Sequence, residues 1–240
     1  MEICVDNIES ALIAYKNGAS RIELCSALEL DGLTPNIGMF KIIKSLIKIP
    51  IFIMIRPREG NFCYNQLEIE SMKEDIKIFK EMYADGFVFG VLTKNLEVDM
   101  EINKTLINVC HPVSATFHRA FDVVKNPLQA LDSIALLGFD RILTSGCYDT
   151  ALQGNNLLTE LIQKTSQTSD NIKWPIIVLA SGIDRNNLAK ILTATKCQEL
   201  HSSCRVKKLS EKKENFDHYS LPDASIITKM IDIAKEFNLL

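Results

Sequence analysis

One feature of this sequence restricts its fold more than any other: short apolar runs alternate with longer amphipathic stretches eight times from end to end. The apolar runs resemble β-strands in length and residue type, and they lie at residues 2–5, 20–25, 50–56, 86–92, 113–118, 140–145, 175–181 and 198–203. Each is followed by helical periodicity, clearest at residues 67–83, 99–109, 127–137, 184–195 and 222–238. This alternation predicts βα units with parallel strands.

Eight βα units can either close into a barrel or form an open, doubly wound sheet. The first strand-type run is not followed by G-x-G-x-x-G, which weakens a dinucleotide-binding open sheet. Polar residues end nearly every run, as expected where loops surround a central mouth, and the 240 residues approach the roughly 250 of a typical barrel. We therefore predict an α/β fold, a single (β/α)8 TIM-type barrel in which residues 1–240 form one domain.

Composition excludes several classes of protein. Hydrophobic residues make up 47% of the chain and charged residues 24%, which is typical of a globular protein. A net charge of -3 is too small to indicate a nucleic-acid partner, and no stretch approaches the roughly 18 apolar residues of a membrane helix. The seven cysteines include no C-x-x-C pair, which argues against a disulfide framework. We expect a cytoplasmic protein with reduced thiols and no membrane partner.

Charged side chains occur inside several strand-type runs. Period-two alternation places the members of each run on one face: Glu2 and Cys4; Arg21, Glu23 and Cys25; Glu199 and His201. Such residues are costly in a strand unless they are paired or face a wet cavity. Taken singly each has a structural explanation, such as a buried pair of Glu23 with Arg56 or a satisfied core histidine at His118. Taken together they predict a site at the C-terminal mouth of the barrel.

The chemistry expected at this mouth follows from charge. Glu2, Glu23 and Glu199 would repel one another if close, which raises the pKa of at least one and creates a general acid or a cation site. The candidates for catalytic groups are Glu23, His118, Glu199 and His201. Arginine side chains would bind an anionic group of a substrate, and Ser181 ends a strand where backbone amides can hold a small anion. The predicted ligand-binding residues are Arg56, Arg58, Arg119, Asp122, Ser181 and Ser202.

Three cysteines are candidate metal ligands. Cys4 and Cys25 lie on the first two strands, which are neighbours in a barrel, and Cys63 lies in the loop after the third strand. Converging thiolates favour Cu(I) or Zn(II), and two or three sulfurs would suffice for Cu(I). The alternative is that these cysteines are small buried hydrophobic residues.

The segment 205–221 is charged and follows the last strand-type run. It is expected to be a loop, either a solvated one or a mobile lid over the mouth.

Several longer motifs resemble those of the CutC family of copper-homeostasis proteins. They are Glu2-Ile3-Cys4, Ser20-Arg21-Ile22-Glu23-Leu24-Cys25, Ile55-Arg56-Pro57-Arg58, Gly60-Asn61-Phe62-Cys63-Tyr64, Thr116-Phe117-His118-Arg119-Ala120-Phe121-Asp122, Leu143-Thr144-Ser145-Gly146 and His201-Ser202-Ser203. The resemblance implies a TIM-type barrel that self-associates, a role in copper tolerance or trafficking, and proposed copper binding. The family resemblance implies no settled reaction. Its motifs fall on ten of the residues selected above: Cys4, Glu23, Cys25, Arg56, Arg58, Cys63, His118, Arg119, Asp122 and His201.

The chain departs from the family pattern in two places. Ala180-Ser181-Gly182 stands where relatives carry a glycine-rich turn, which places a phosphate site there in doubt. The residues after Ser203 also differ, so the last loop cannot be inferred from the family.

Three hypotheses for function follow. The first is a cytosolic copper-handling protein that binds Cu(I), a dimer or other homo-oligomer, with Cys4, Cys25 and Cys63 as ligands. The second is an enzyme acting on a small anionic metabolite through the arginine, histidine and glutamate side chains at the mouth. The third is a barrel that serves mainly as an assembly surface.

Overall fold

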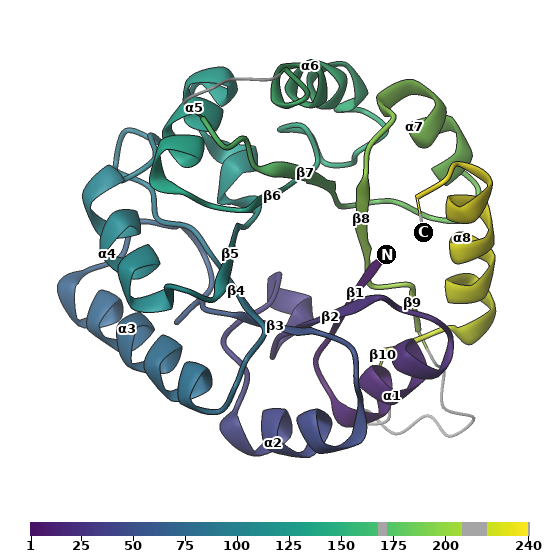
Figure 1. Ribbon diagram of the computed structural model, residues 1–240, viewed down its shortest axis with the longest axis horizontal. Helices are drawn as coiled ribbons and strands as arrows, with labels where there is room; N and C mark the ends of the chain where they lie inside the picture. Colours follow the sequence, from purple (N-terminus) through teal and green to yellow (C-terminus); the bar gives the residue numbers. More distant parts are fainter. Residues whose placement is uncertain (168–171, 208–219, 240) are drawn as a thin grey trace.

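The structure is a computed structural model that describes residues 1–167, 172–207 and 220–239. Eight parallel strands close into a barrel with a ring of helices outside it (Figure 1). The last strand pairs with the first, and Glu2 lies opposite His201 at this seam. The strands are β1 (Glu2–Val5), β2 (Arg21–Leu24), β3 (Ile51–Met54), β4 (Gly86–Phe89), β5 (Ser114–Phe117), β6 (Arg141–Thr144), β7 (Ile176–Leu179) and β8 (Glu199–Ser202). The predicted (β/α)8 barrel is confirmed.

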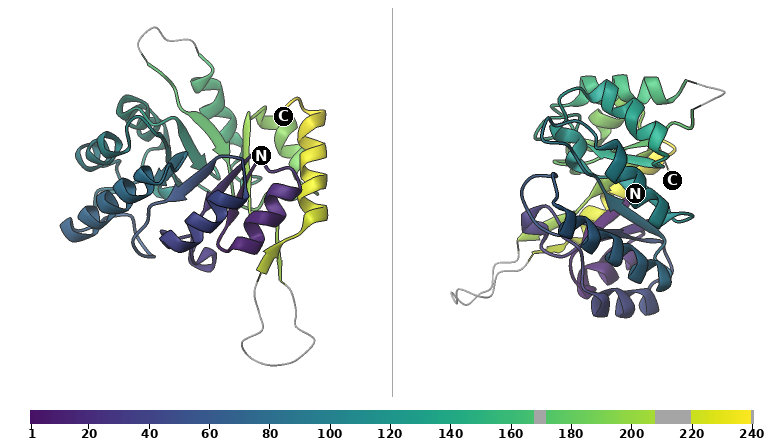
Figure 2. Two further views of the ribbon diagram at one scale, coloured as in Figure 1. Left: turned by 60° about the horizontal axis from the view of Figure 1, so that its bottom comes forward. Right: turned by 90° about the vertical axis from the view of Figure 1, so that its left-hand side faces the viewer.

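The helices surround the barrel, and α8 lies against α1 and α7, which closes the ring (Figure 2). They are α1 (Ile8–Lys16), α2 (Ile37–Leu46), α3 (Gln66–Glu81), α4 (Met100–Cys110), α5 (Pro127–Leu137), α6 (Asn155–Thr165), α7 (Leu188–Thr195) and α8 (Ala224–Glu236), with the 3-10 turns η1 (Leu28–Leu30) and η2 (Arg119–Val123). Side chains accept the unpaired N–H groups of most first turns. These capping residues are Asn7, Asn36, Asn65, Asp99, Asn126 and Asp223.

Most of the apolar core lies between the barrel and its helices. Strand side chains that point outward, such as Ile3, Ile22 and Phe117, are fully buried there. Helices α2 and α3 contribute Phe40 and Phe79, whose ring centroids are 5.4 Å apart in an edge-to-face arrangement. Full burial of one such side chain stabilises the fold by about 1.5–3 kcal/mol. Because this outer layer supplies the apolar burial, the inside of the barrel can accommodate polar groups.

The inside of the barrel is apolar on two sides only. Cys25, Phe52, Met54 and Val88 pack together on the side formed by β2, β3 and β4, and a smaller cluster of Leu143, Val178 and Ala180 lies on β6 and β7. The inward positions on β8, β1 and β2 carry Glu199, His201, Glu2, Cys4, Arg21 and Glu23. Most of the interior charge therefore lies along the seam of β8, β1 and β2, and Arg141 reaches it from β6.

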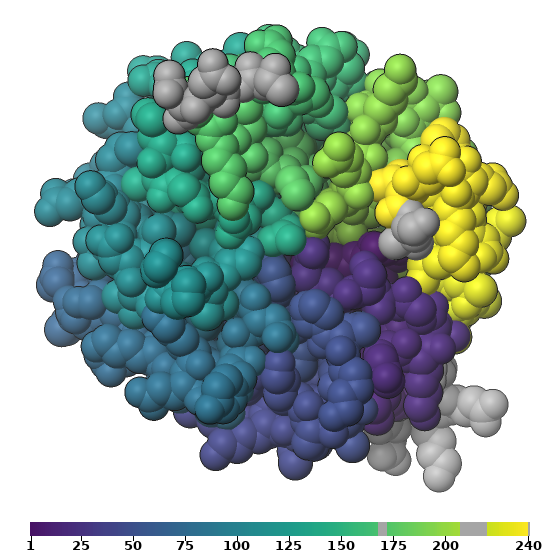
Figure 3. Space-filling model, in the orientation of Figure 1, coloured from purple at the N-terminus to yellow at the C-terminus, as the bar shows by residue number. Residues whose placement is uncertain are grey.

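The face that carries the N-terminal ends of the strands is closed by packed side chains (Figure 3). The Phe52 ring lies inside the barrel, 4.9 Å from the guanidinium carbon of Arg21 and 5.1 Å from that of Arg141. A Cβ at Gly86 on the next strand would lie 2.6 Å from this ring. Glycine at position 86 therefore makes room for the aromatic ring. The open mouth of the barrel lies at the opposite, C-terminal end of the strands, where barrels of this type carry their sites.

The segment after β8 has a strand at each end, where a loop was predicted over 205–221. Arg205–Lys207 (β9) and Ser220–Pro222 (β10) pair as an antiparallel ribbon, so the loop prediction is wrong for these residues. Leu221 is fully buried, which gives the ribbon an apolar anchor. The rest of the predicted loop or lid falls on residues 208–219, which lie outside the described residues. No helix in the described part of the chain is long and apolar enough to cross a membrane.

Candidate functional site

A pocket of about 820 Å³ opens at the C-terminal ends of the strands. We name it the mouth pocket. The predicted site residues that line it are Cys4, Glu23, Arg56, His118, Arg119, Asp122, Ser181, His201 and Ser202. Four other predicted residues do not line it, namely Cys25, Arg58, Cys63 and Glu199. The mouth pocket thus brings together side chains from strands that are distant in the sequence.

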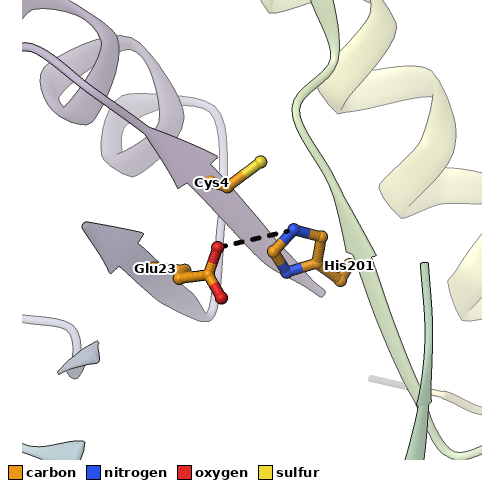
Figure 4. A group of neighbouring side chains, drawn as sticks. All are labelled: Cys4, Glu23 and His201. Atoms are coloured by element: carbon orange, nitrogen blue, oxygen red, sulfur yellow. Dashed lines mark ion pairs between the residues drawn. The ribbon is translucent and has the colours of Figure 1, made fainter. Parts of the chain in front are cut away.

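Three potential metal ligands converge at the seam of the barrel. Cys4 on β1 lies opposite Glu23 on β2, and His201 reaches them from β8 (Figure 4). One donor atom from each lies within 4.8 Å of the other two, and all three residues are buried. Within the described residues this is the one cluster of three or more such side chains close enough to hold an ion. We name it the Cys4–Glu23–His201 group.

His201 is held between two carboxyl groups. Its Nδ1–H donates to Glu2 Oε1 at 2.5 Å, and its Nε2 lies 3.7 Å from Glu23 Oε2. Burial alone would lower the pKa of His201, but the neighbouring Cys4, Glu23 and Glu2 raise this pKa well above its usual value. Because Glu2 fixes one ring nitrogen, the other is directed toward the Cys4–Glu23–His201 group.

Glu23 is the carboxyl group whose ionisation is least favourable. Burial, with a smaller contribution from Glu2, raises the pKa of Glu23 to about 7 against the favourable charge of His201. Its Oε2 accepts a weak hydrogen bond from Cys25 Sγ at 3.5 Å, and its Oε1 is buried without a partner. A carboxyl group with this pKa can gain or lose a proton near neutral pH.

A separate network lies deeper in the barrel, toward the N-terminal ends of the strands. Arg21 bonds to both Glu2 and Glu199, and Arg141 bonds to Glu199 at 3.1 Å. We name these residues the basal network. Burial opposes ionisation of Glu2, but His201 and Arg21 lower its pKa to about 2. The expected repulsion among three glutamates is therefore replaced by ion pairing at two of them.

The basal network places Glu199 away from the mouth. Glu199 begins β8, and it lines a smaller cavity of about 240 Å³ together with Glu2 and Arg21. Arg141, its second partner, was not among the predicted residues. The sequence pattern could have indicated Arg141, because it is a charged residue at the first position of β6. It shares a face of that strand with Leu143, which points into the barrel.

Arg56 and His118 form the opposite wall of the mouth pocket. The guanidinium of Arg56 donates to the carbonyls of Leu30, Gly32 and Gly60, but its Nε has no partner. His118 Nδ1 accepts the Ala120 N–H at 3.3 Å, and its Nε2 also has no partner. Burial and the positive charge of Arg56 lower the pKa of His118 to about 3.

The sequence did not single out Phe62, which lines this wall, or Thr116, which is buried on β5 and does not line the pocket. The Phe62 ring lies 5.2 Å from the Arg56 guanidinium carbon and 4.9 Å from the His118 ring, so it contacts both. Thr116 is buried with a hydroxyl that has no partner. Alternation on β5 places Thr116 on the same face as His118, but a threonine is too common in strands to stand out.

Other predicted ligand-binding residues are used to fix loops. Arg58 pairs with Glu68 at 2.6 Å and bonds to the carbonyl of Cys63. Asp122 pairs with Arg119 at 2.7 Å and accepts the N–H of Ser145. These contacts fix the loops after β3 and β5, while Arg119 still borders the mouth pocket.

The two serines also make internal hydrogen bonds. Ser181 Oγ donates to Asp149 O at 2.7 Å, and Ser202 Oγ donates to Ile183 O at 3.3 Å. Ser181 has a φ of 71°, in the left-handed region that favours glycine. The chain thus keeps the backbone conformation of a glycine turn while carrying a side chain there.

The three cysteines predicted as ligands do not form one cluster. Cys25 packs against Phe52 and Met54 in the apolar cluster of β2–β4, and burial raises its pKa well above the usual value. Cys63 Sγ donates to the Thr93 carbonyl at 3.2 Å and lies outside the mouth pocket. Cys4 instead joins Glu23 and His201. All seven cysteines are free thiols.

Comparison with known proteins identifies the family. Residues 1–206 match the family model described as the CutC family. This chain belongs to the CutC family. The match ends where the β9–β10 ribbon begins, so it covers the whole barrel wall and the Cys4–Glu23–His201 group.

Relatives of this CutC-family chain include a "Copper homeostasis protein cutC homolog" from Homo sapiens. It is 46% identical over 206 residues, which cover 85% of this chain and 73% of that protein. A "family protein CutC" from Histophilus somni (strain 2336) is 41% identical over 215 residues, 90% of this chain and 86% of the relative. The resemblance to the family is therefore confirmed.

Solved structures support the same assignment. The putative copper homeostasis protein CutC from Streptococcus agalactiae superposes with a TM-score of 0.77 at 31% identity, covering 84% of this chain and 97% of that one. N-(5'-phosphoribosyl)anthranilate isomerase from Pyrococcus furiosus superposes with a TM-score of 0.57 at only 14% identity, covering 98% of each chain. The second likeness shows the barrel fold alone.

Proposed function

We propose that this protein acts in copper homeostasis by binding Cu(I) at the base of the mouth pocket. The observation that supports the proposal is the convergence of Cys4 Sγ, His201 Nε2 or Nδ1, and a Glu23 oxygen within 4.8 Å of one another. Copper is here the cargo, to be bound and released in copper tolerance or trafficking. The names of the human and bacterial relatives support the process.

The donor set suits Cu(I). A metal–sulfur bond is about 2.3 Å and a metal–nitrogen bond about 2.0 Å, so two donors on opposite sides of one ion are about 4.3 Å apart. The donor atoms of the Cys4–Glu23–His201 group lie within 4.8 Å of one another, so small side-chain movements would bring them to this separation. A thiolate is a soft ligand that selects Cu(I), and imidazole also suits copper. Glu2 would keep the His201 ring in place through its bond to Nδ1.

Placing Cu(I) at the Cys4–Glu23–His201 group changes two of the three ligands expected from the sequence. Cys4 remains the candidate thiolate, while His201 replaces Cys63 as the expected second ligand because Cys63 lies outside the mouth pocket. Cys25 lies next to Glu23 and would approach an ion only if its side chain turned from the apolar cluster. We therefore assign Cys25 at most a supporting role.

The test is an anaerobic Cu(I) titration against a competing chelator. We expect one ion per chain in the wild type, and a loss of affinity by more than about a hundredfold in Cys4→Ser and in His201→Gln, since each removes a direct ligand. Cys63→Ser is the matched control, because it removes one thiol outside the mouth pocket and should bind as the wild type does. Equal binding by Cys4→Ser and the wild type would overturn the proposal.

Two properties accompany this proposal. We expect a cytoplasmic location, where seven free thiols would stay reduced. We also expect a homo-oligomer, for which a dimer is the simplest form. Support comes from helix α2, where Ile37, Ile42 and Leu46 are 40–49% exposed. Light scattering of the purified chain tests the second property, and a monomer at all concentrations would contradict it.

A second candidate function is an enzyme that acts on a small anionic metabolite in the same pocket. Its specific support is the wall formed by Arg56 and His118, whose Nε and Nε2 atoms have no partner. Glu23, with its pKa of about 7, would supply or accept a proton. Incubation with candidate metabolites, followed by NMR for substrate loss, tests this function with Glu23→Gln as the comparison variant. Equal turnover by the two proteins would exclude Glu23 from the reaction.

A further inference from the structure

We infer that the mouth pocket binds an organic monocarboxylate, whose carboxylate group is held by Arg56 and His118. The inference rests on the second candidate function and narrows its ligand from any small anion to one chemical class. The remainder of the ligand would extend along Phe62 toward the Cys4–Glu23–His201 group. Four observations support it: an unpaired buried cation, an unpaired neutral donor, the charge of the surrounding wall, and the size of the pocket.

The first observation is a buried positive charge without a counter-charge. Arg56 is only 4% exposed, and its hydrogen bonds go to three backbone carbonyls, which are neutral. Across the described residues no carboxylate pairs with it, and its Nε is buried without a partner. The nearby Tyr64 supplies no negative charge, because burial raises the pKa of its hydroxyl to about 12. A buried guanidinium in this state is stabilised by an anionic ligand.

The second observation is the tautomer of His118. Because Nδ1 accepts the N–H of Ala120, the hydrogen of the neutral ring must be on Nε2. That Nε2–H has no acceptor, although the side chain is only 3% exposed and borders the mouth pocket. A neutral imidazole therefore presents one hydrogen-bond donor beside Arg56 without adding a second positive charge. One cation and one neutral donor match the two oxygens of a carboxylate.

The third observation concerns the other charges of the pocket wall. Arg119 is paired with Asp122, and Arg205 lies 3.6 Å from Asp6, so both are already compensated. Arg56 is thus the uncompensated cation among the arginines that line the described wall.

The pocket rim adds negative charge. It carries the exposed carboxyl groups of Glu29, Asp31, Glu59 and Asp184. A phosphate dianion carries two negative charges, but this wall offers it the one uncompensated charge of Arg56 and a rim of four carboxylates. A singly charged anion would balance the charge of Arg56. The charge of the wall therefore favours a monoanion.

The fourth observation is size and surface. The mouth pocket has a volume of about 820 Å³, far more than a lone inorganic anion fills and within the roughly 300–1,000 Å³ of organic-ligand sites. Its wall includes apolar side chains, among them Met54, Phe62 and Leu143. Phe62 contacts both Arg56 and His118, so the carbon skeleton of a bound carboxylate would lie against its ring.

The test is 15N NMR of histidine-labelled protein, in which His118 gives the signal of a neutral ring protonated on Nε2. The probes are acetate, pyruvate and benzoate, with inorganic phosphate and chloride as comparison anions. We expect the carboxylates to shift the His118 Nε2 signal in a saturable way, while phosphate and chloride leave it unchanged at equal ionic strength. Calorimetric titration of the best carboxylate then gives its affinity.

Variants assign the binding to this wall. Arg56→Gln should weaken carboxylate affinity by at least about tenfold, as expected for a lost charge-assisted hydrogen bond. Arg58→Gln is the matched control, because it removes an equal charge two residues away and outside the mouth pocket. If Arg56→Gln does not fold, His118→Gln with calorimetric titration replaces it, and the same loss is expected.

The possible outcomes separate the proposals. A saturable shift with phosphate and none with carboxylates would overturn the monocarboxylate and leave the small-anion function standing. No shift with any probe would overturn both. Carboxylate binding that is lost in Arg58→Gln but kept in Arg56→Gln would also overturn the assignment. All carboxylate titrations are made on copper-free protein, which keeps this test independent of Cu(I) binding.

Discussion

Glu2 and His201 face each other across the seam where β1 meets β8, and the Glu2 carboxylate accepts the His201 Nδ1–H at 2.5 Å. Glu2 also bonds to Arg21, so one carboxylate joins the basal network to the Cys4–Glu23–His201 group. Because these residues come from opposite ends of the barrel sequence, the closure of the barrel and the geometry of the site depend on the same contact.

Glu2→Gln should therefore affect both stability and copper binding. Loss of two charge-assisted hydrogen bonds to a buried carboxylate is expected to lower the free energy of unfolding by about 2–3 kcal/mol. The His201 ring loses the partner that orients it, so Cu(I) affinity should fall by about tenfold or more. Urea denaturation and the chelator titration measure the two effects. Glu70→Gln is the control, because it breaks an exposed pair with Lys73 and should change neither the free energy of unfolding nor the Cu(I) affinity. An equally small effect of Glu2→Gln would contradict the proposed connection between barrel closure and the copper site.

His118 should make the protein less stable in acid. Its pKa in the folded chain is about 3, lowered first by burial and then by Arg56, against 6.5 in an unfolded chain. Between these pH values the unfolded chain binds a proton that the folded chain does not, so stability is complete above 6.5 and falls as the pH is lowered toward 3. The unfolding free energy of His118→Gln, measured by urea denaturation across this range, should fall less steeply than that of the wild type.

A second histidine variant is the control for this pH effect. His111 is exposed at the end of α4, so His111→Gln should keep the slope of the wild type. Parallel curves for His118→Gln and the wild type would show that His118 titrates normally in the folded protein.

The barrel and its mouth could be predicted because both depend on local periodicity. Eight runs with a period of two, separated by helical stretches, specify the number of strands and the face that each side chain shares. Cys4, Glu23 and His201 were placed on inward faces for this reason. The CutC motifs then supplied the same positions from a second source.

The sequence could not predict how deep each charged residue lies in the barrel, or which residue it pairs with. Glu199 and His201 lie two residues apart on one face of β8, yet one belongs to the basal network and the other to the mouth. Their depth depends on the stagger between strands, which no single strand encodes. The pairing of Glu199 with Arg141 joins strands that are not neighbours in the barrel, so it could not be read from adjacent motifs.

Gly86 offers a test of how tightly the interior is packed. Gly86→Ala would place a Cβ 2.6 Å from the Phe52 ring, which is too close without movement of one of them. We expect a loss of about 1–3 kcal/mol in the free energy of unfolding, as for other overpacked cores. Gly38→Ala is the control on helix α2, where the new Cβ would be 3.4 Å from Asn36 Oδ1; it should be neutral or stabilise by up to about 1 kcal/mol. An equal response of both variants to urea would contradict the packing argument.

Glu199→Gln should separate structural from functional charge. Glu199 pairs with Arg21 and Arg141 in the basal network and does not line the mouth pocket. Removing its charge leaves two partly buried arginines with only one carboxylate, Glu2, so the unfolding free energy should fall by about 3 kcal/mol or more. Cu(I) affinity and carboxylate binding should stay within about twofold of the wild type, because a twofold change corresponds to less than 0.5 kcal/mol. A folded Glu199→Gln protein that no longer binds either ligand would place Glu199 in the functional site and contradict the division of the interior into two layers.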